Sequence, residues 1–102
     1  MTSIVLAVLM FLSSPVMAQT SDATQRGEAA FKSNGCYGCH LIGKFGTPIG
    51  PELTHVGSKY EPEYLARWLR DPSLQRPSAH MPKLELTEAD VQALAVYLGS
   101  LR

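Results

Sequence analysis

The sequence is poor in cysteine and has no excess of charge of either sign. Its 102 residues contain two cysteines, nine basic residues and nine acidic residues. Two cysteines this close together, Cys36 and Cys39, cannot build the disulfide framework that stabilises many small exported domains. The balanced charge argues against nucleic acid as a partner and against strong electrostatic attachment to acidic membranes. A domain of this size needs another source of stability, and a bulky apolar cofactor in its core would supply one.

An uncharged apolar segment opens the chain. Ile4–Leu12 is unbroken, Ser13–Pro15 interrupts it, and the segment closes on the small residue Ala18. This layout predicts a secretory signal peptide over residues 1–18, cleaved after Ala18, and one domain over residues 19–102. A retained membrane anchor is the alternative, although the run is shorter than the roughly 20 apolar residues of a spanning helix. A buried core helix would need a polar face that the run lacks. We therefore expect an exported, periplasmic protein with no membrane span in residues 19–102.

Three segments of the remaining chain show helical periodicity, and none shows a convincing period of two. The pattern predicts an all-α domain with long loops and no sheet. The loop at 43–57 is rich in glycine and proline, and a second loop spans 72–85. The expected helices are residues 23–34, residues 62–70 and a last one that starts at Thr87. The first is expected to bury Gly27, Ala30 and Phe31, and the second Leu65, Trp68 and Leu69. The buried face of the last is expected to hold Val91, Leu94, Ala95, Leu98 and Leu101.

Residues that favour helix ends flank each of these segments. Ser21 or Asp22 can cap the first helix, and Gly35 suits the left-handed residue that ends it. Proline fits the first turn of the second helix, and Asp71-Pro72 stops that helix. Thr87, with an acidic residue three positions on, resembles a capping box at the start of the last helix.

Residues 36–40 carry the clearest chemical signal. They read Cys-Tyr-Gly-Cys-His, which is the attachment motif of c-type haem. Cys36 and Cys39 have the spacing that reaches the two vinyl groups of one porphyrin. His40 then lies beneath the ring, where its imidazole can bind the iron. The motif predicts one covalently bound haem c.

Other interpretations of the cysteine pair fit less well. A structural zinc site needs four ligands, and beyond the cysteines only the scattered His40, His55 and His80 remain as soft donors. A thioredoxin-like redox pair needs a βαβ context that this sequence lacks. A disulfide between such close cysteines would close too small a loop to stabilise the fold.

The sixth iron ligand is predicted to be Met81. It is the only methionine after residue 18, and it lies in a loop, next to Pro82, rather than on a helical core stripe. A methionine in this position suggests a ligand more than a gap-filler. His80 and His55 are rival ligands, and Met81 could also merely pack on the haem face. Histidine and methionine together would leave no open iron site for a substrate.

With these residues in place, residues 19–102 resemble the small monohaem class I cytochromes c of bacteria. The haem motif, the Gly50-Pro51-Glu52-Leu53 segment and Met81-Pro82 carry the resemblance, and the crossing of the first and last helices agrees with it. The resemblance implies a cytochrome c-like fold around one haem. It also implies that the Pro51 carbonyl accepts a hydrogen bond from His40 and that Trp68 lies near the distal ligand. The indole N–H needs a partner when buried, and a haem propionate is one candidate.

The function expected from these residues is electron transfer rather than enzymatic catalysis. The partners would be redox proteins that bind briefly, with donor and acceptor unspecified. A dedicated cytochrome subunit of a periplasmic oxidoreductase, such as a dehydrogenase, is an alternative of another class. A gas-binding or peroxidatic haem protein is a third and would require a displaceable sixth ligand. Met81 argues against that third function.

Overall fold

The computed structural model describes residues 3, 5, 7, 8, 10 and 16–102, and for residues 16–21 it describes the backbone only. The predicted signal peptide therefore lies largely outside the described residues. The regular elements in chain order are α1 Val16–Ser33, η1 Cys36–Gly38, β1 Leu41–Ile42, β2 Phe45–Gly46, η2 Val56–Ser58, α2 Pro62–Arg70, α3 Pro72–Gln75 and α4 Glu88–Gly99.

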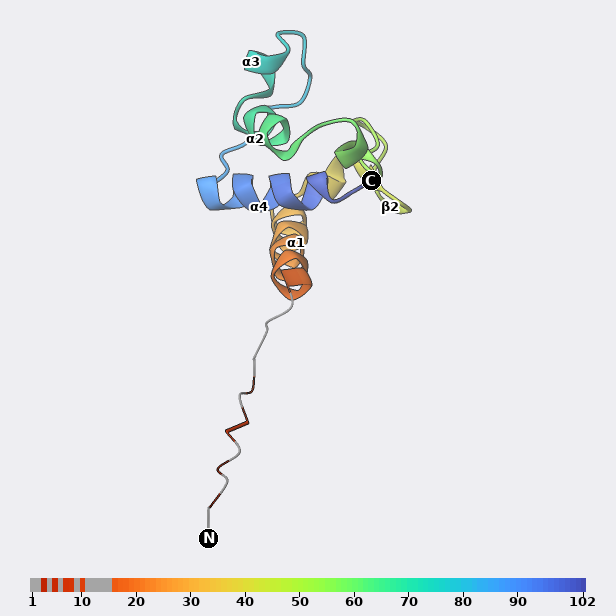
Figure 1. Cartoon of the computed structure of the whole chain (residues 1–102). Coiled ribbons are helices and arrows are strands. Elements are labelled where there is room, and N and C mark those ends of the chain that lie inside the picture. The colour runs from red at the N-terminus through yellow and green to blue at the C-terminus, as the bar shows by residue number, and fades with distance from the viewer. Residues whose placement is uncertain (1–2, 4, 6, 9, 11–15) are drawn as a thin grey trace.

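The crossing of α1 and α4 forms the centre of the core (Figure 1). Gly27 makes the crossing close, because a Cβ there would collide with the carbonyl of Ala93 and the side chain of Tyr97. Phe31 and Leu94 are the largest fully buried side chains of these two helices, with 1% and 0% of their surface exposed. The predicted faces of both helices are thus the ones that pack, except that Leu101, expected on the face of the last helix, lies beyond the end of that helix and is only partly buried.

Helix α2 packs on α4 away from α1, so that α4 is the middle layer of the domain (Figure 1). Leu65 and Leu69 bury the face of α2 that meets α4. The chain end is tied in as well, because the backbone N–H of Gly57 donates to the carbonyl of Leu101 over 2.7 Å. The packing fixes α2 and the loop that follows it relative to the α1–α4 crossing.

The predicted helix ends agree with the structure at most positions. Helix α2 spans the expected residues, with proline in its first turn. Gly35 has the expected left-handed conformation, with φ of 73°. The Thr87 side chain caps α4 by accepting from the backbone N–H of Asp90 over 3.1 Å. These ends were predictable because each depends on one or two neighbouring residues.

Three local expectations were wrong. Helix α1 begins at Val16 rather than at residue 23, because no residue between 16 and 22 breaks a helix. Asp22 does not cap the helix but forms an ion pair with Arg26 one turn later. A short hairpin, β1–β2, forms where no strand was expected, since Gly43 with φ of 61° turns the chain sharply. Pro72, expected only to stop α2, also starts the four-residue helix α3.

Apart from this hairpin, the regular elements of the described chain are all helical and long loops join them, so the prediction of an all-α domain with three main helices is confirmed. Within the described residues, no helix is both long and apolar enough to cross a bilayer.

Candidate functional site

The cysteine segment begins directly after α1. Gly35 turns the chain, and η1 carries the first cysteine into a tight turn in which the N–H groups of Cys39 and His40 both donate to the carbonyl of Cys36, over 3.2 and 3.1 Å. Cys36 is half-buried and Cys39 is exposed, and both thiols are free. Burial raises the pKa of the Cys36 thiol, so that it is neutral at ordinary pH. The two thiols are thus available for attachment at two points.

Tyr37, between the two cysteines, anchors this turn to the core. Its ring packs edge-on against Phe31, with the ring centroids 4.6 Å apart. Phe31 in turn packs against Tyr97 on α4. Burial raises the pKa of Tyr97, and a hydrogen bond with Tyr37 acts in the same direction. The aromatic contacts therefore tie the attachment turn to the α1–α4 crossing.

His40 is oriented by a backbone carbonyl. Its Nδ1 lies 2.7 Å from the carbonyl oxygen of Pro51, the partner that the family resemblance implied. A carbonyl can only accept, so Nδ1 carries the proton and donates. The other ring nitrogen, Nε2, then keeps its lone pair and can bind a metal.

Glycines make room for this histidine. A Cβ on Gly50 would lie 2.7 Å from His40 Cε1, and a Cβ on Gly46 would collide with the His40 carbonyl oxygen. The Gly50 N–H also donates to the carbonyl of Cys39 over 2.5 Å, which folds the Pro51 segment back onto the cysteine turn. From the sequence, Gly46 was read only as a breaker of regular structure, and Gly50 also as part of the Gly-Pro-x-Leu segment of the family; neither was expected to contact the histidine. Their positions on either side of Pro48, close to the histidine motif, were the signal that could have found them.

Met81 and Trp68 form a second pair of contacting residues, one from the segment between α3 and α4 and the other from α2. Met81 lies between α3 and α4, is half-buried and packs against the core. Trp68, on α2, donates from Nε1 to Met81 Sδ over 3.1 Å. The indole N–H therefore has the methionine sulfur as a partner, and Trp68 lies beside Met81, the predicted distal ligand, as the family resemblance implied.

The histidines that compete with Met81 as the sixth ligand lie in more exposed positions than Met81 does. His55 and His80 are both exposed. No group of three or more His, Cys, Asp or Glu side chains gathers as a metal site within the part of the chain that the structure describes. The zinc interpretation therefore finds no donor set in the described fold.

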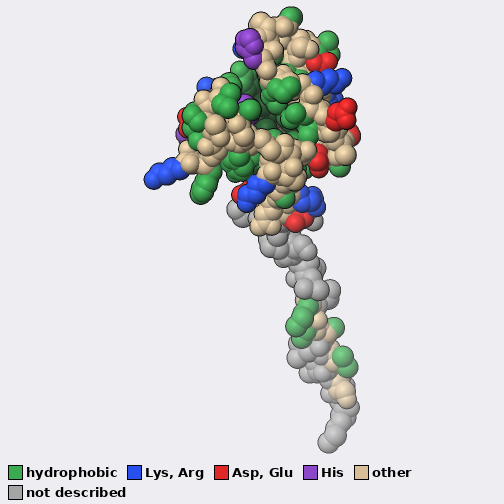
Figure 2. Space-filling view, turned by 180° about the vertical axis from the view of Figure 1, so that it is seen from behind, with side chains coloured by type: hydrophobic (Ala, Val, Ile, Leu, Met, Phe, Trp, Pro, Cys, Tyr) green, Lys and Arg blue, Asp and Glu red, His purple; other side chains and the backbone are tan. Residues whose placement is uncertain are grey.

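Hydrophobic side chains line a hollow on the face shown in Figure 2. Several apolar residues from the site segments are only partly buried and pack against the core from outside: Cys36, Tyr37, Ile42, Leu53, Met81, Leu86 and Leu101. Half-exposed apolar surface next to two free thiols and an oriented imidazole fits a large, flat, apolar group that binds iron. The residues present therefore fit haem c: Cys36 and Cys39 would hold it covalently, and His40 would bind the iron.

Known proteins similar to this chain agree with these observations. The family model described as cytochrome c matches residues 24–102. Two similar proteins are named cytochrome c oxidase subunit 2. The one from Alkalihalophilus pseudofirmus is 33% identical over 89% of this chain, and the one from Bacillus sp. (strain PS3) is 31% identical over 81%. These matches cover 29% and 27% of the relatives, so the chain spans less than a third of their length.

The family match covers the His40–Pro51 pair and the Trp68–Met81 pair, and the helical fold and the haem-attachment motif agree with it. Its implied cofactor is covalently bound haem c, and it supports haem-based electron transfer. The chain belongs to the cytochrome c family.

Proposed function

We propose that this protein transfers electrons through one haem c, attached at Cys36 and Cys39, with His40 and Met81 as the axial iron ligands. When bound, an iron with histidine and methionine ligands gains and loses one electron and offers no open position to a substrate. The observation that carries the proposal is the contact between His40 Nδ1 and the Pro51 carbonyl, which leaves Nε2 with its lone pair available to bind iron.

The chain's own residues would keep this site rigid. Pro51 holds the plane of the His40 ring, and Trp68 holds the sulfur of Met81. Side chains that are held by second contacts move little when the charge on a metal changes, and this lowers the cost of each electron transfer. Tyr37 and Phe31 keep the cysteine turn against the core.

The proposed location is outside the cytoplasmic membrane, as the apolar segment over residues 1–18 suggests. The proposed partners are redox proteins. The similarity to two proteins named cytochrome c oxidase subunit 2 favours an oxidase among them. It also favours the second candidate, in which this chain is a dedicated cytochrome subunit of an oxidoreductase rather than a free carrier. Size exclusion of the protein from its native source would separate the two, because a subunit would elute with its enzyme.

The ligand assignment is tested by the absorption spectrum of the reduced haem-loaded protein with and without carbon monoxide. The native protein is expected to show a c-type spectrum that the gas does not change. Met81→Ala should open the site, so that carbon monoxide binds. Leu86→Ala is the matched control, because Leu86 lies in the same segment and also packs against the core. If the gas binds the native protein readily, the site is open, and the proposal of a closed electron carrier is wrong.

A further inference from the structure

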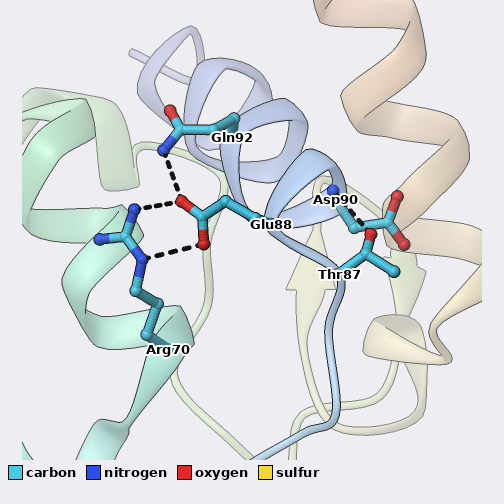
Figure 3. A network of polar contacts seen from close by, with 5 residues as sticks. All are labelled: Arg70, Thr87, Glu88, Asp90 and Gln92. Atoms are coloured by element: carbon cyan, nitrogen blue, oxygen red, sulfur yellow. Dashed lines mark hydrogen bonds and ion pairs between the residues drawn. The ribbon is translucent and has the colours of Figure 1, made fainter.

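The segment that carries Met81 leaves α2 and returns to α4, and an ion pair joins its two ends. Arg70 is the last residue of α2, and Glu88 is the first residue of α4. The guanidinium of Arg70 grips the carboxylate as a fork: Nε donates to Oε2 over 3.2 Å, and Nη2 donates to Oε1 over 2.5 Å (Figure 3). Such bidentate pairs fix orientation as well as distance. The two partners are 18 residues apart in the sequence.

The α4 end of this segment is held from several sides. Gln92, one turn along α4, donates to Oε1 of Glu88 over 3.1 Å (Figure 3). Asp90 receives a hydrogen bond from Asn34, at the end of α1, over 3.2 Å. Thr87 caps the helix by accepting from the backbone N–H of Asp90. The return point of the segment is therefore fixed, and Arg70 is the link that ties it to α2.

The part of the segment around Met81 has few contacts of its own. Residues 71–79 contain α3 and its turns, but no backbone–backbone hydrogen bond involves residues 80–86 within the described chain. Met81 is held by the indole of Trp68 and by packing against the core. A stretch without backbone hydrogen bonds opens at low cost, so the fixing of its ends controls how often it opens.

We infer that Arg70 and Glu88 are positioning residues for Met81, and that their forked ion pair closes the ends of residues 71–87 and so limits how often the methionine leaves the iron. The inference rests on the proposed function, in which Met81 is an iron ligand. Helix α2 then acts on the methionine twice: Trp68 contacts the sulfur, and Arg70 holds the far end of the segment.

The size of the effect follows from the exposure of the pair. The Arg70 side chain is 44% exposed and the Glu88 side chain 62%, and exposed ion pairs are weak. Breaking the fork is therefore expected to raise the fraction of protein with Met81 off the iron by about two- to five-fold. Salt screens exposed charges, so the native protein should move in the same direction as ionic strength rises.

The test is the affinity of the oxidised, haem-loaded full chain for imidazole, which binds the iron only where Met81 has left it. Arg70→Gln and Glu88→Gln are each expected to raise that affinity by about two- to five-fold, and the double variant no further, because one interaction is removed in each case. Arg26→Gln is the matched control: it breaks an exposed ion pair with Asp22 on α1, away from the segment, and should leave the affinity unchanged.

Hydrogen exchange is the second readout and does not depend on iron chemistry. Backbone amides of residues 80–86 should exchange faster by a similar factor in both single variants and not in Arg26→Gln. The inference is overturned if imidazole affinity is unchanged in Arg70→Gln and Glu88→Gln, or if Arg26→Gln raises it equally.

Met81→Ala distinguishes this failure from a failure of the proposed ligation. If Met81→Ala leaves imidazole affinity unchanged, the methionine is not the ligand, and both proposals fall. If Met81→Ala raises the affinity but neither fork variant does, only the role of Arg70 and Glu88 is wrong.

Discussion

The two sides of the site are built by different means. The His40 side is a backbone structure: backbone–backbone hydrogen bonds cross the chain between Cys36 and Leu53, and glycine allows two of its segments to approach closely. The Met81 side is a side-chain structure, in which Trp68 meets the sulfur and no backbone–backbone hydrogen bond holds residues 80–86 within the described chain. The first side should therefore resist disturbance elsewhere in the fold, whereas the second depends on how α2 and α4 pack.

The largest expected effect is on the His40 side. Gly46 has φ of 109°, and a Cβ there would collide with the His40 carbonyl. Gly46→Ala should lower the free energy of unfolding by about 2–4 kcal/mol, since strain and overlap act together. Gly43→Ala is the control: φ is also positive, at 61°, but the space is open, so a loss of about 1 kcal/mol is expected. Urea unfolding of both variants measures the difference. Equal losses of unfolding free energy in the two variants would show that overlap of the Gly46 Cβ with the His40 carbonyl contributes nothing.

The next effect concerns the start of α4, where the Met81 segment ends. Thr87→Ala removes the hydroxyl that accepts from the Asp90 N–H and should cost about 1 kcal/mol in urea unfolding. Thr87→Ser keeps the cap and should stay close to the native protein. Because the cap also fixes the segment end, hydrogen exchange in residues 80–86 should rise with the alanine variant alone. A rise with serine as well would mean that the methyl group, not the cap, matters.

A smaller effect is expected at the methionine sulfur. A hydrogen bond to the sulfur draws electron density from it and favours reduced iron, so Trp68→Phe should lower the reduction potential by about 20–40 mV. Tyr64→Phe is the matched control, because it removes a hydroxyl from the same helix at a residue whose ring stacks on Tyr60. Redox titration of both variants measures the shift. An unchanged potential in Trp68→Phe would show that the indole only fills space.

The smallest effect is the pH dependence of the Arg70–Glu88 fork. Hydrogen bonds from Arg70 and Gln92 lower the pKa of Glu88 to about 2 from its ordinary 4.5. Between these values the unfolded chain binds more protons than the folded one, so stability rises with pH there. The contribution is complete above about pH 4.5 and is lost as pH falls through about 2. The stability advantage of the native protein over Glu88→Gln should therefore shrink on acidification over that window. If the difference in unfolding free energy between the native protein and Glu88→Gln stays constant as the pH falls, the predicted pH dependence is wrong.

The same contrast separates what was predictable from what was not. The contact between His40 and Pro51 was expected from the family resemblance, and Gly35, Pro62 and Thr87 marked helix ends correctly because their effects are local. The start of α1 was placed wrongly, because a good cap can equally sit inside a longer helix.

The glycines beside His40 were missed for a different reason. Gly46 was read only as a breaker of regular structure, and Gly50 also as part of the family's Gly-Pro-x-Leu segment, but their importance is that two segments of chain approach each other there. Which segments approach is a property of the folded chain. Composition alone cannot show it.

By itself, the sequence determined the haem-attachment motif and with it the kind of cofactor. The spacing of Cys36, Cys39 and His40 is a covalent fact that no fold can alter, and the single methionine after residue 18 made Met81 the predicted sixth ligand of the iron. The family resemblance added the partner of His40 and placed Trp68 near the distal ligand, but only the tertiary structure showed the atoms that meet. The indole Nε1 of Trp68 donates to the Met81 sulfur 13 residues on, and Arg70 on α2 forms a fork with Glu88 on α4 18 residues on, where α2 packs against α4. Such contacts depend on helix placement and side-chain rotamers, which local sequence does not encode.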